Sequence, residues 1–132
     1  MNNRKRILIS GCNGAIGSNL CSFFKKKGWF VLGIDKHQKS NSNLDEYEQI
    51  NFLNIKHDEI PLKIEKIKKK YFDNGLDCII NNAALQIVKP FKELTINDIT
   101  DSFEVNAYAP FLLIKLLITI NLDHIILMIF RH

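Results

Sequence analysis

The chain has 132 residues, which is enough for one domain, because soluble domains commonly contain about 100–150 residues. Apolar residues make up 46% of the sequence and charged residues 24%, a balance that is ordinary for a globular core and argues against disorder. The size also excludes architectures that add a long substrate domain.

The net charge of +4 is concentrated in the first half of the chain. Residues 1–70 contain 14 Lys and Arg against 7 Asp and Glu, whereas residues 71–132 contain 4 against 7. Most of the excess lies in short runs at residues 4–6, 25–27 and 66–70, without the interleaved aromatic residues of a groove for single-stranded nucleic acid. We interpret these runs as solvated helix ends and a terminal tail, and predict no nucleic-acid partner.

The cysteine pattern predicts neither a metal site nor a disulfide framework. The three cysteines form no Cys-x-x-Cys pair, and an odd number without a secretory signal favours a reducing compartment. The longest apolar stretch, residues 107–120, contains a proline and a lysine and is shorter than the ~20 residues that a membrane helix needs. We therefore expect a cytoplasmic protein without membrane contact.

Strand and helix signals alternate along the chain. Short apolar runs predict strands at residues 7–9, 30–34, 49–53, 76–80 and 125–130, with a polar loop over residues 36–48. Helical spacing predicts helices from Ile16 to a stop at residues 25–28, from Ile60 to Tyr71, and from near Thr95 to Ile118. This alternation predicts a Rossmann-like, three-layer α/β/α fold with a parallel sheet in the order 3-2-1-4-5.

Three glycines stand between the first strand and the first helix. Gly11, Gly14 and Gly17 permit a tight turn and a close approach of the backbone to a pyrophosphate at the helix N-terminus. The alternative is an ordinary strand-to-helix turn, in which the glycines are present only because a side chain would not fit. Asp35 favours the dinucleotide interpretation, because it ends the second strand 18 residues after Gly17, where a carboxylate can accept hydrogen bonds from a ribose.

The long helix contains a second feature with chemical meaning. Its apolar stripe comprises Ile96, Ile99, Phe103, Ala107, Phe111, Ile114, Leu117 and Ile118. Asn106 lies at the edge of this stripe, so we expect its side chain to face protein. Pro110 cannot donate to the carbonyl of Asn106, and a kink that frees a carbonyl can hold a water. A purely structural kink is the alternative.

These motifs together resemble the first half of the short-chain dehydrogenase/reductase family. Residues 10–17 match the family's opening glycine loop except that Ala15 replaces the middle glycine, and the glycine spacing itself is that of the extended branch, which includes nucleotide-sugar epimerases and dehydratases. Downstream, residues 81–84 resemble its Asn-Asn-Ala-Gly, with alanine last, and residues 105–107 resemble the Val-Asn segment of its long helix, which favours the single-domain dehydrogenase branch. The resemblance covers residues 6–126.

The resemblance implies one NAD(P)-binding Rossmann domain over residues 1–132, in partial form, and assigns roles to particular residues. Asn51 falls where the family usually has an adenine-contacting Asp, and Asn106 matches the catalytic Asn whose main-chain carbonyl holds a proton-relay water. A strand-end turn is the alternative for Asn81 and Asn82. The implied cofactor contacts are Gly11, Asn13, Gly14, Ala15, Ile16, Gly17, Asp35, Asn51, Phe52, Asn82, Ala83 and Ala84.

The catalytic groups of the second half of the family are missing from this sequence. Hydride transfer in the family needs a Tyr, a Lys four residues later and a Ser, but no Tyr-x-x-x-Lys occurs here and the last serine is Ser102. We therefore expect a fragment or frameshifted product, with a sheet that is incomplete at one edge, a tendency to self-associate, and no activity alone.

We predict that the chain binds NAD rather than NADP, because a 2′-phosphate would lie against Asp35. In the full-length family a small-molecule substrate is a further partner. Two other functions remain open: a non-catalytic Rossmann-like binding or interaction module, and a fragment of an extended-branch epimerase or dehydratase.

Overall fold

The computed structural model describes residues 4–39, 43–53 and 59–118, and the backbone of residues 125–128. Five parallel strands form one sheet in the order β3-β2-β1-β4-β5, which confirms the predicted strand order. The strands are β1 (Arg6–Ser10), β2 (Phe30–Asp35), β3 (Glu46–Gln49), β4 (Cys78–Asn81) and β5 (Ile125–Met128). The helices are α1 (Ala15–Lys26), α2 (Glu59–Tyr71), the 3-10 turn η1 (Phe91–Glu93), α3 (Ile96–Phe103), the π-helix η2 (Glu104–Tyr108) and α4 (Ala109–Leu117).

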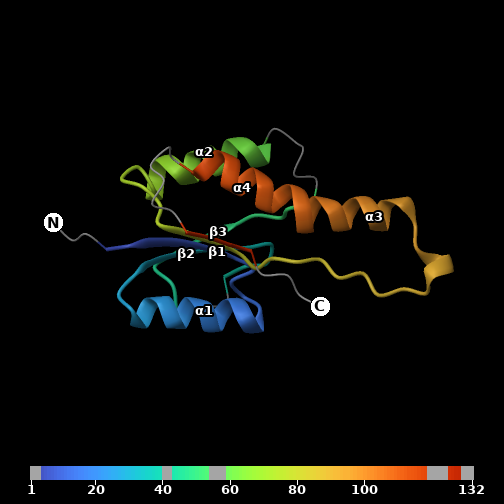
Figure 1. Ribbon diagram of the computed structural model, residues 1–132, viewed down its shortest axis with the longest axis horizontal. Helices are drawn as coiled ribbons and strands as arrows, with labels where there is room; N and C mark the ends of the chain where they lie inside the picture. The colour runs from blue at the N-terminus through green and yellow to red at the C-terminus, as the bar shows by residue number, and fades with distance from the viewer. Residues whose placement is uncertain (1–3, 40–42, 54–58, 119–124, 129–132) are drawn as a thin grey trace.

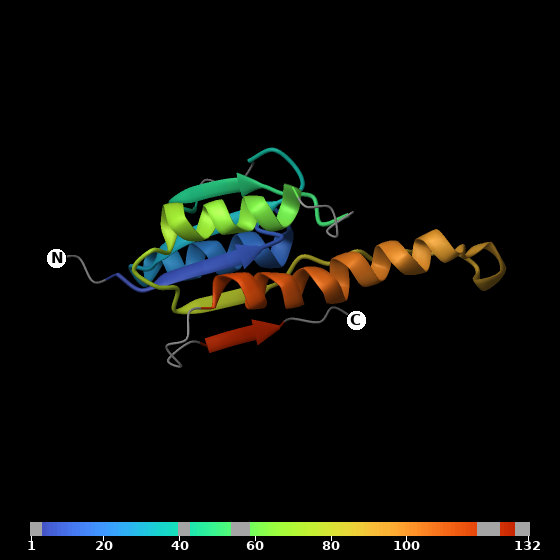
Figure 2. The same cartoon turned by 90° about the horizontal axis from the view of Figure 1, so that it is seen from above.

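Helices cover both faces of the sheet and give the predicted three layers (Figure 1). Helix α1 covers one face, and helices α2 and α4 lie side by side on the other (Figures 1 and 2). Each face has its own apolar core, and β1 contributes to both: Ile7 and Ile9 pack on the α1 side, whereas Leu8 packs under α2 and α4. Burial on both faces is the reason that this strand is a continuous apolar run.

The third strand lies earlier in the chain than the sequence predicted. It spans Glu46–Gln49 rather than residues 49–53, and residues 46–48 were expected to be loop. Because β3 is the strand next to β2 at the edge of the sheet, its residues are only partly covered, and a polar sequence suffices there. The apolar residues of the predicted strand, Ile50 and Phe52, are buried in the core beside α2, but they belong to the loop that follows.

Helices α3 and α4 are joined through the π-helix η2. A capping box begins α3 at Thr95, where the sequence predicted the start of the helix: Asp98 N–H donates to Thr95 Oγ1, and the Asp98 carboxylate accepts from Thr95 N–H. Within η2, the N–H of Ala109 donates to the carbonyl of Glu104, five residues earlier. The π-helix thus stands where a kink was expected from Pro110, which is the second residue of α4.

The buried face of this long helical unit differs from the predicted stripe. Its core residues are Val105, Ala109, Leu113 and Leu117, whereas most of the predicted stripe, including Ile96, Ile99, Phe103 and Phe111, is exposed. Two physical facts explain the error: α4 is apolar nearly all round, and the wider turn of η2 changes the register between α3 and α4. Figure 2 also shows that α3 extends past the ends of the strands, so little protein covers it.

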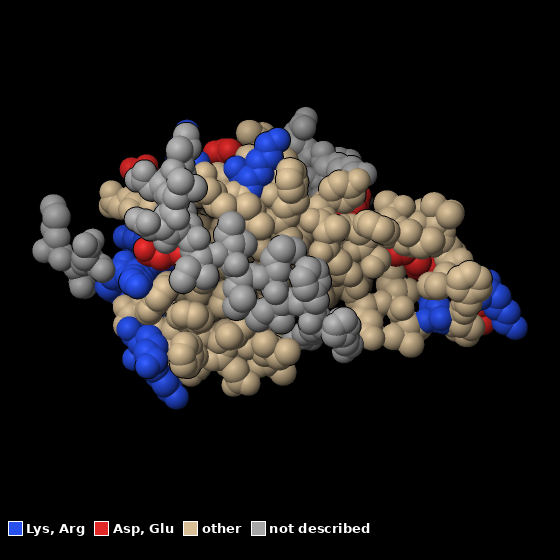
Figure 3. Space-filling model, in the orientation of Figure 1, with Lys and Arg blue, Asp and Glu red and all other residues tan. Residues whose placement is uncertain are grey.

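Part of the basic sequence is engaged in an ion-pair cluster. Asp45 accepts from Arg4 Nη2 at 3.2 Å, from Lys25 Nζ at 2.7 Å and from Val31 N–H at 2.8 Å, which fastens α1 and the chain before β1 to the start of β2. Burial alone would raise the pKa of Asp45, but these donors lower it below its usual value. Figure 3 shows Lys and Arg side chains near the N-terminal end of the molecule, and others over its centre and at the opposite tip. Among the described residues, no helix is long and apolar enough to cross a membrane.

We predict that the chain self-associates through the exposed apolar face of α3 and α4. Phe103 and Phe111 are 58% and 63% exposed there, and exposed apolar groups in one patch favour association. Replacing both with serine is expected to lower the mass measured by light scattering. Phe23→Ser is the matched control, since Phe23 is 53% exposed but lies on α1, across the sheet. A monodisperse monomer of the unsubstituted chain with a cooperative melt would contradict this prediction.

Candidate functional site

The carboxyl ends of β1, β2 and β4 meet around a cavity of about 330 Å³. In open parallel sheets this edge is the usual place for ligands, because the strand order reverses direction there. The cavity is lined by Gly11, Asn13, Gly14, Asp35, Lys36, His37, Asn51, Phe52, Leu53, Asn82, Ala83, Ala84, Leu85 and Val105.

The glycine loop is tightly packed against the first turn of α1. Gly11 has φ of +66°, which side chains disfavour, and the Gly14 N–H donates to its carbonyl at 3.2 Å. At Gly17, a Cβ would stand 2.0 Å from the carbonyl oxygen of Gly11. No side chain caps α1, and its first turn contains no acidic residue. The N–H groups at the start of this helix therefore point toward the loop without a helical acceptor, which is the arrangement that binds anions.

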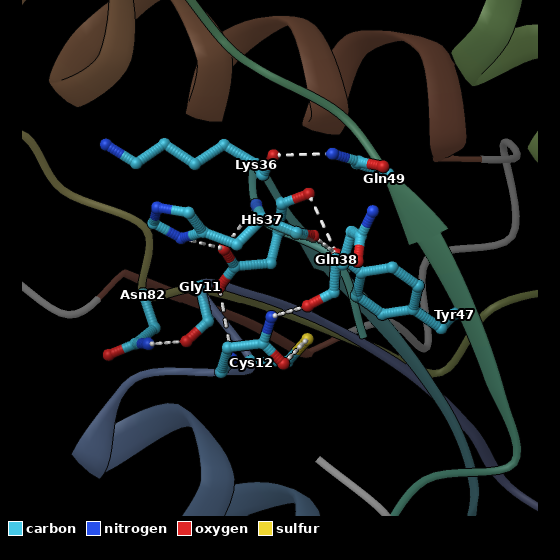
Figure 4. A network of polar contacts seen from close by, with 10 residues as sticks. Gly11, Cys12, Lys36, His37, Gln38, Tyr47, Gln49 and Asn82 are labelled. Atoms are coloured by element: carbon cyan, nitrogen blue, oxygen red, sulfur yellow. Dashed lines mark hydrogen bonds and ion pairs between the residues drawn. The ribbon is translucent and has the colours of Figure 1, made fainter. Parts of the chain in front are cut away.

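Ser10 and Asn82 fasten this loop to the end of β4. Ser10 Oγ accepts from the N–H of Asn82 at 3.1 Å and of Ala83 at 3.0 Å. In return, Asn82 Nδ2 donates to the carbonyl of Ser10 at 3.2 Å and to the carbonyl of Gly11 at 3.1 Å, and Figure 4 shows the bond to Gly11. Asn82 Oδ1 and the side-chain amide of Asn81 are buried and have no hydrogen-bond partner among the described residues. The two motifs of the sequence, the glycine loop and residues 81–84, thus form one unit.

Asp35 is the acceptor at the centre of the opposite wall. Its side chain is only 9% exposed. Oδ2 accepts from the N–H of Asn13 at 3.1 Å, and Oδ1 accepts from the N–H of His37 at 3.1 Å, with His37 Nδ1 at 3.3 Å. The carboxylate therefore links the glycine loop to the turn after β2. Asp35 also lines the cavity.

Asn51 and Phe52 lie side by side in the cavity wall but differ in their surroundings. Asn51 is exposed, and its Oδ1 accepts from the N–H of Leu53 at 3.0 Å, an Asx turn that shapes the wall. Phe52 is buried in the core cluster under α2 and α4. A flat apolar ring beside a polar amide is a surface suited to an aromatic ligand group.

Asn106 lies behind the cavity wall rather than in it. Its side chain faces protein, as expected: Oδ1 accepts from the N–H of Leu85, and Nδ2 donates to the carbonyl of Leu85, both at 2.8 Å. Nδ2 also approaches Ser102 Oγ at 3.1 Å. This pair of bonds joins η2 to the segment after β4 and so fixes Leu85 and Val105, which do line the cavity.

Most of the residues singled out by the sequence line this cavity, but Asn106 and three residues of the first turn of α1 do not. Ala15 and Ile16 are exposed in the first turn of α1, and Gly17 is buried beneath the loop. Sequence reasoning did not place five other lining residues in the site: Lys36, His37, Leu53, Leu85 and Val105. Each of them lies within two residues of a predicted site residue or motif, and this proximity in sequence was the available signal.

The family follows from comparison with known proteins. The sequence profile of the short chain dehydrogenases matches residues 5–124 of the chain. This protein belongs to the short-chain dehydrogenase family. A curated relative, the NADPH-dependent 1-acyldihydroxyacetone phosphate reductase of Schizosaccharomyces pombe, is 29% identical over 110 residues, which are 82% of this chain and 37% of the relative.

Two related solved structures hold a nucleotide. The chain resembles the short-chain dehydrogenase of Leptospira borgpetersenii with bound NAD⁺, with a TM-score of 0.67 and 29% identity over 86% of this chain and 44% of that one. It also resembles 4-hydroxyisoleucine dehydrogenase complexed with NADH, with a TM-score of 0.68 and 27% identity over 85% of this chain and 47% of that one. The chain of 132 residues thus spans less than half the length of these relatives.

The contact between Gly17 and Gly11 generates a stability prediction. Gly17→Ala is expected to lower the free energy of unfolding by about 1–3 kcal/mol, because its Cβ forces the loop away from α1. Helix propensity alone would raise the free energy of unfolding by about 1 kcal/mol. The sign of the measured change therefore distinguishes the packing effect from helix propensity. Urea denaturation measures it, with Asn19→Ala at an exposed position of α1 as the control. A Gly17→Ala midpoint at or above that of the unsubstituted chain would refute the packing argument.

Proposed function

We propose that residues 1–132 form the dinucleotide-binding part of a short-chain dehydrogenase and that they bind NAD in the cavity between β1, β2 and β4. The observation that carries the proposal is the pairing, across one cavity, of an uncapped helix N-terminus with a buried carboxylate. The start of α1 suits a pyrophosphate, and Asp35 suits the hydroxyls of the adenosine ribose.

Further features of the cavity fit the two ends of the dinucleotide. Gly11 and Gly14 line the cavity near the start of α1, where the absence of side chains lets a pyrophosphate approach the backbone. Asn51 and Phe52 offer a wall for the adenine. On the other side, Asn82 Oδ1 is a buried acceptor that a ribose hydroxyl would satisfy, and Ala83 and Ala84 have side chains small enough to leave room there.

The choice of NAD over NADP rests on charge. A 2′-phosphate placed about 4 Å from the Asp35 carboxylate would be repelled by ~4 kcal/mol at an effective dielectric of 20. Lys36, which follows Asp35 and lines the cavity, offsets part of this repulsion. The relatives include an NADPH-dependent reductase and structures that hold NADH or NAD⁺. They therefore do not distinguish between the two dinucleotides, and the preference for NAD rests on Asp35.

We therefore expect calorimetric titration to show tighter binding of NAD than of NADP. Asp35→Asn, which keeps one acceptor oxygen but removes the charge, is expected to weaken NAD about threefold to tenfold and to narrow the difference between the nucleotides. Asp73→Asn is the control, since Asp73 is an exposed carboxylate after α2, away from the cavity lining. Tighter binding of NADP by the unsubstituted chain would overturn the assignment.

The residues present supply cofactor binding but not the complete chemistry of the family. When bound, NAD accepts or donates a hydride. In this chain Asn106 lies in the π-helix next to the cavity wall, where its main-chain carbonyl would hold a relay water. The 132 residues contain no Tyr-x-x-x-Lys to protonate or deprotonate a substrate oxygen. Since a positioned acid or base contributes about 10²–10⁴-fold to such a step, binding alone does not give turnover.

We predict that the 132-residue chain does not oxidise alcohols or reduce carbonyl compounds at a detectable rate, even with NAD bound. A screen of alcohols, ketones and sugars that follows NADH absorbance tests this, with Asn106→Ala as the control for contaminating activity. Turnover that disappears in Asn106→Ala would show that the chain contains a proton donor other than the Tyr-Lys pair.

A further inference from the structure

We propose that Tyr47 and Gln49, on β3, are positioning residues that hold the turn at residues 36–38 against Asp35 and thereby set the preference for NAD over NADP. This inference rests on the proposed function and concerns two residues outside the cavity lining. It assigns the choice of nucleotide to a braced turn as well as to the carboxylate.

The turn after β2 is held by side chains from two other parts of the chain. Its three consecutive main-chain carbonyls each accept a hydrogen bond from a side chain, and Figure 4 shows Tyr47 and Gln49 reaching toward it from β3. The bonds run from Gln49 Nε2 to the carbonyl of Lys36 at 2.9 Å, from Tyr47 Oη to that of His37, and from Asn13 Nδ2 to that of Gln38 at 2.9 Å.

Strand register explains why β3 can supply two of these donors. Tyr47 pairs with Gly33 and Gln49 pairs with Asp35 in the parallel ladder of β2 and β3. Residues two apart on a strand project from the same face, so both side chains reach the turn that follows Asp35. The Tyr47 hydroxyl also lies 3.2 Å from the carbonyl of Asp35. Burial raises the pKa of Tyr47, which keeps the phenol protonated and a donor at neutral pH.

The position of the turn determines what surrounds the Asp35 carboxylate. The N–H of His37 donates to Oδ1 at 3.1 Å, so the turn itself orients the carboxylate in the cavity. The side chains of Lys36 and His37 are exposed at the same rim. While the turn is held, the Lys36 cation stays at this rim beside a carboxylate that repels a 2′-phosphate. A released turn would lose the bond to Asp35 and let the Lys36 ammonium move toward a phosphate, which favours NADP.

The test measures the dissociation constants of NAD and NADP by calorimetry for two variants and one control. Tyr47→Phe keeps the ring, which packs against the α1-side core, and removes only the hydroxyl. Gln49→Met removes the donor at an exposed position, so its effect does not depend on core packing. Tyr71→Phe is the control, because its hydroxyl also makes one side-chain hydrogen bond, to Glu48 at 2.8 Å, and Tyr71 does not line the cavity. Thermal unfolding is measured for all three.

The expected result is a ratio of the NADP to the NAD dissociation constant that falls about threefold to tenfold in Tyr47→Phe and in Gln49→Met, the range given by loss of one hydrogen bond. Most of the fall should come from weaker NAD binding, and Tyr71→Phe should keep the ratio of the unsubstituted chain. A lower melting temperature with an unchanged ratio, or equal weakening of both nucleotides, would overturn the inference while leaving the NAD site intact. Failure of the unsubstituted chain to bind either nucleotide would instead refute the proposed function, and this inference with it.

Discussion

The close approach of α1 to the loop after β1 is the constraint on which the rest of the site depends. A hydrogen atom at Gly17 occupies the place where a Cβ would stand 2.0 Å from the Gly11 carbonyl oxygen. That carbonyl also accepts from Gly14 N–H and from Asn82 Nδ2. Because one peptide group makes all these contacts, the helix N-terminus, the glycine loop and the end of β4 keep fixed relative positions.

Asp35 extends this rigid unit to the second strand. Its two carboxylate oxygens bind the N–H groups of Asn13 and His37, one in the glycine loop and one in the turn after β2. A largely buried charge is stable only when hydrogen bonds satisfy it, so the fold depends on the same carboxylate that we assign to the ribose. Tyr47 and Gln49 brace the outer side of that turn. In the proposed function, the affinity for NAD and the preference for NAD over NADP therefore depend on the same network of hydrogen bonds.

The sequence was informative where burial is complete. The apolar runs of β1 and β2 and the glycines predicted the strand order and the position of the loop, because buried parallel strands and tight turns restrict residue type. It was misleading where burial is partial. Strand β3 is polar because it lies at an edge, and the core face of α4 could not be chosen among residues that are nearly all apolar.

The remaining features of the site depend on contacts that are distant in sequence. The bonds of Asn106 to Leu85 and of Gln49 to Lys36 join segments that are 21 and 13 residues apart, and neither pair has a local pattern. A π-helix leaves no distinct signature either, although Pro110 marked its neighbourhood. His37 lines the site because of the path of the turn, and side chains of β3 and Asn13 hold that turn.

The central claim is that NAD binds across the carboxyl ends of β1, β2 and β4. Titrating the ¹⁵N-labelled chain with NAD while recording backbone amide shifts tests it most directly, because each amide reports its own position. The account predicts that the largest shifts occur at residues 11–17, 35–37 and 82–85, with little change at the opposite end of the sheet around Asp45. Unchanged spectra at millimolar NAD, or shifts centred on another surface, would contradict it.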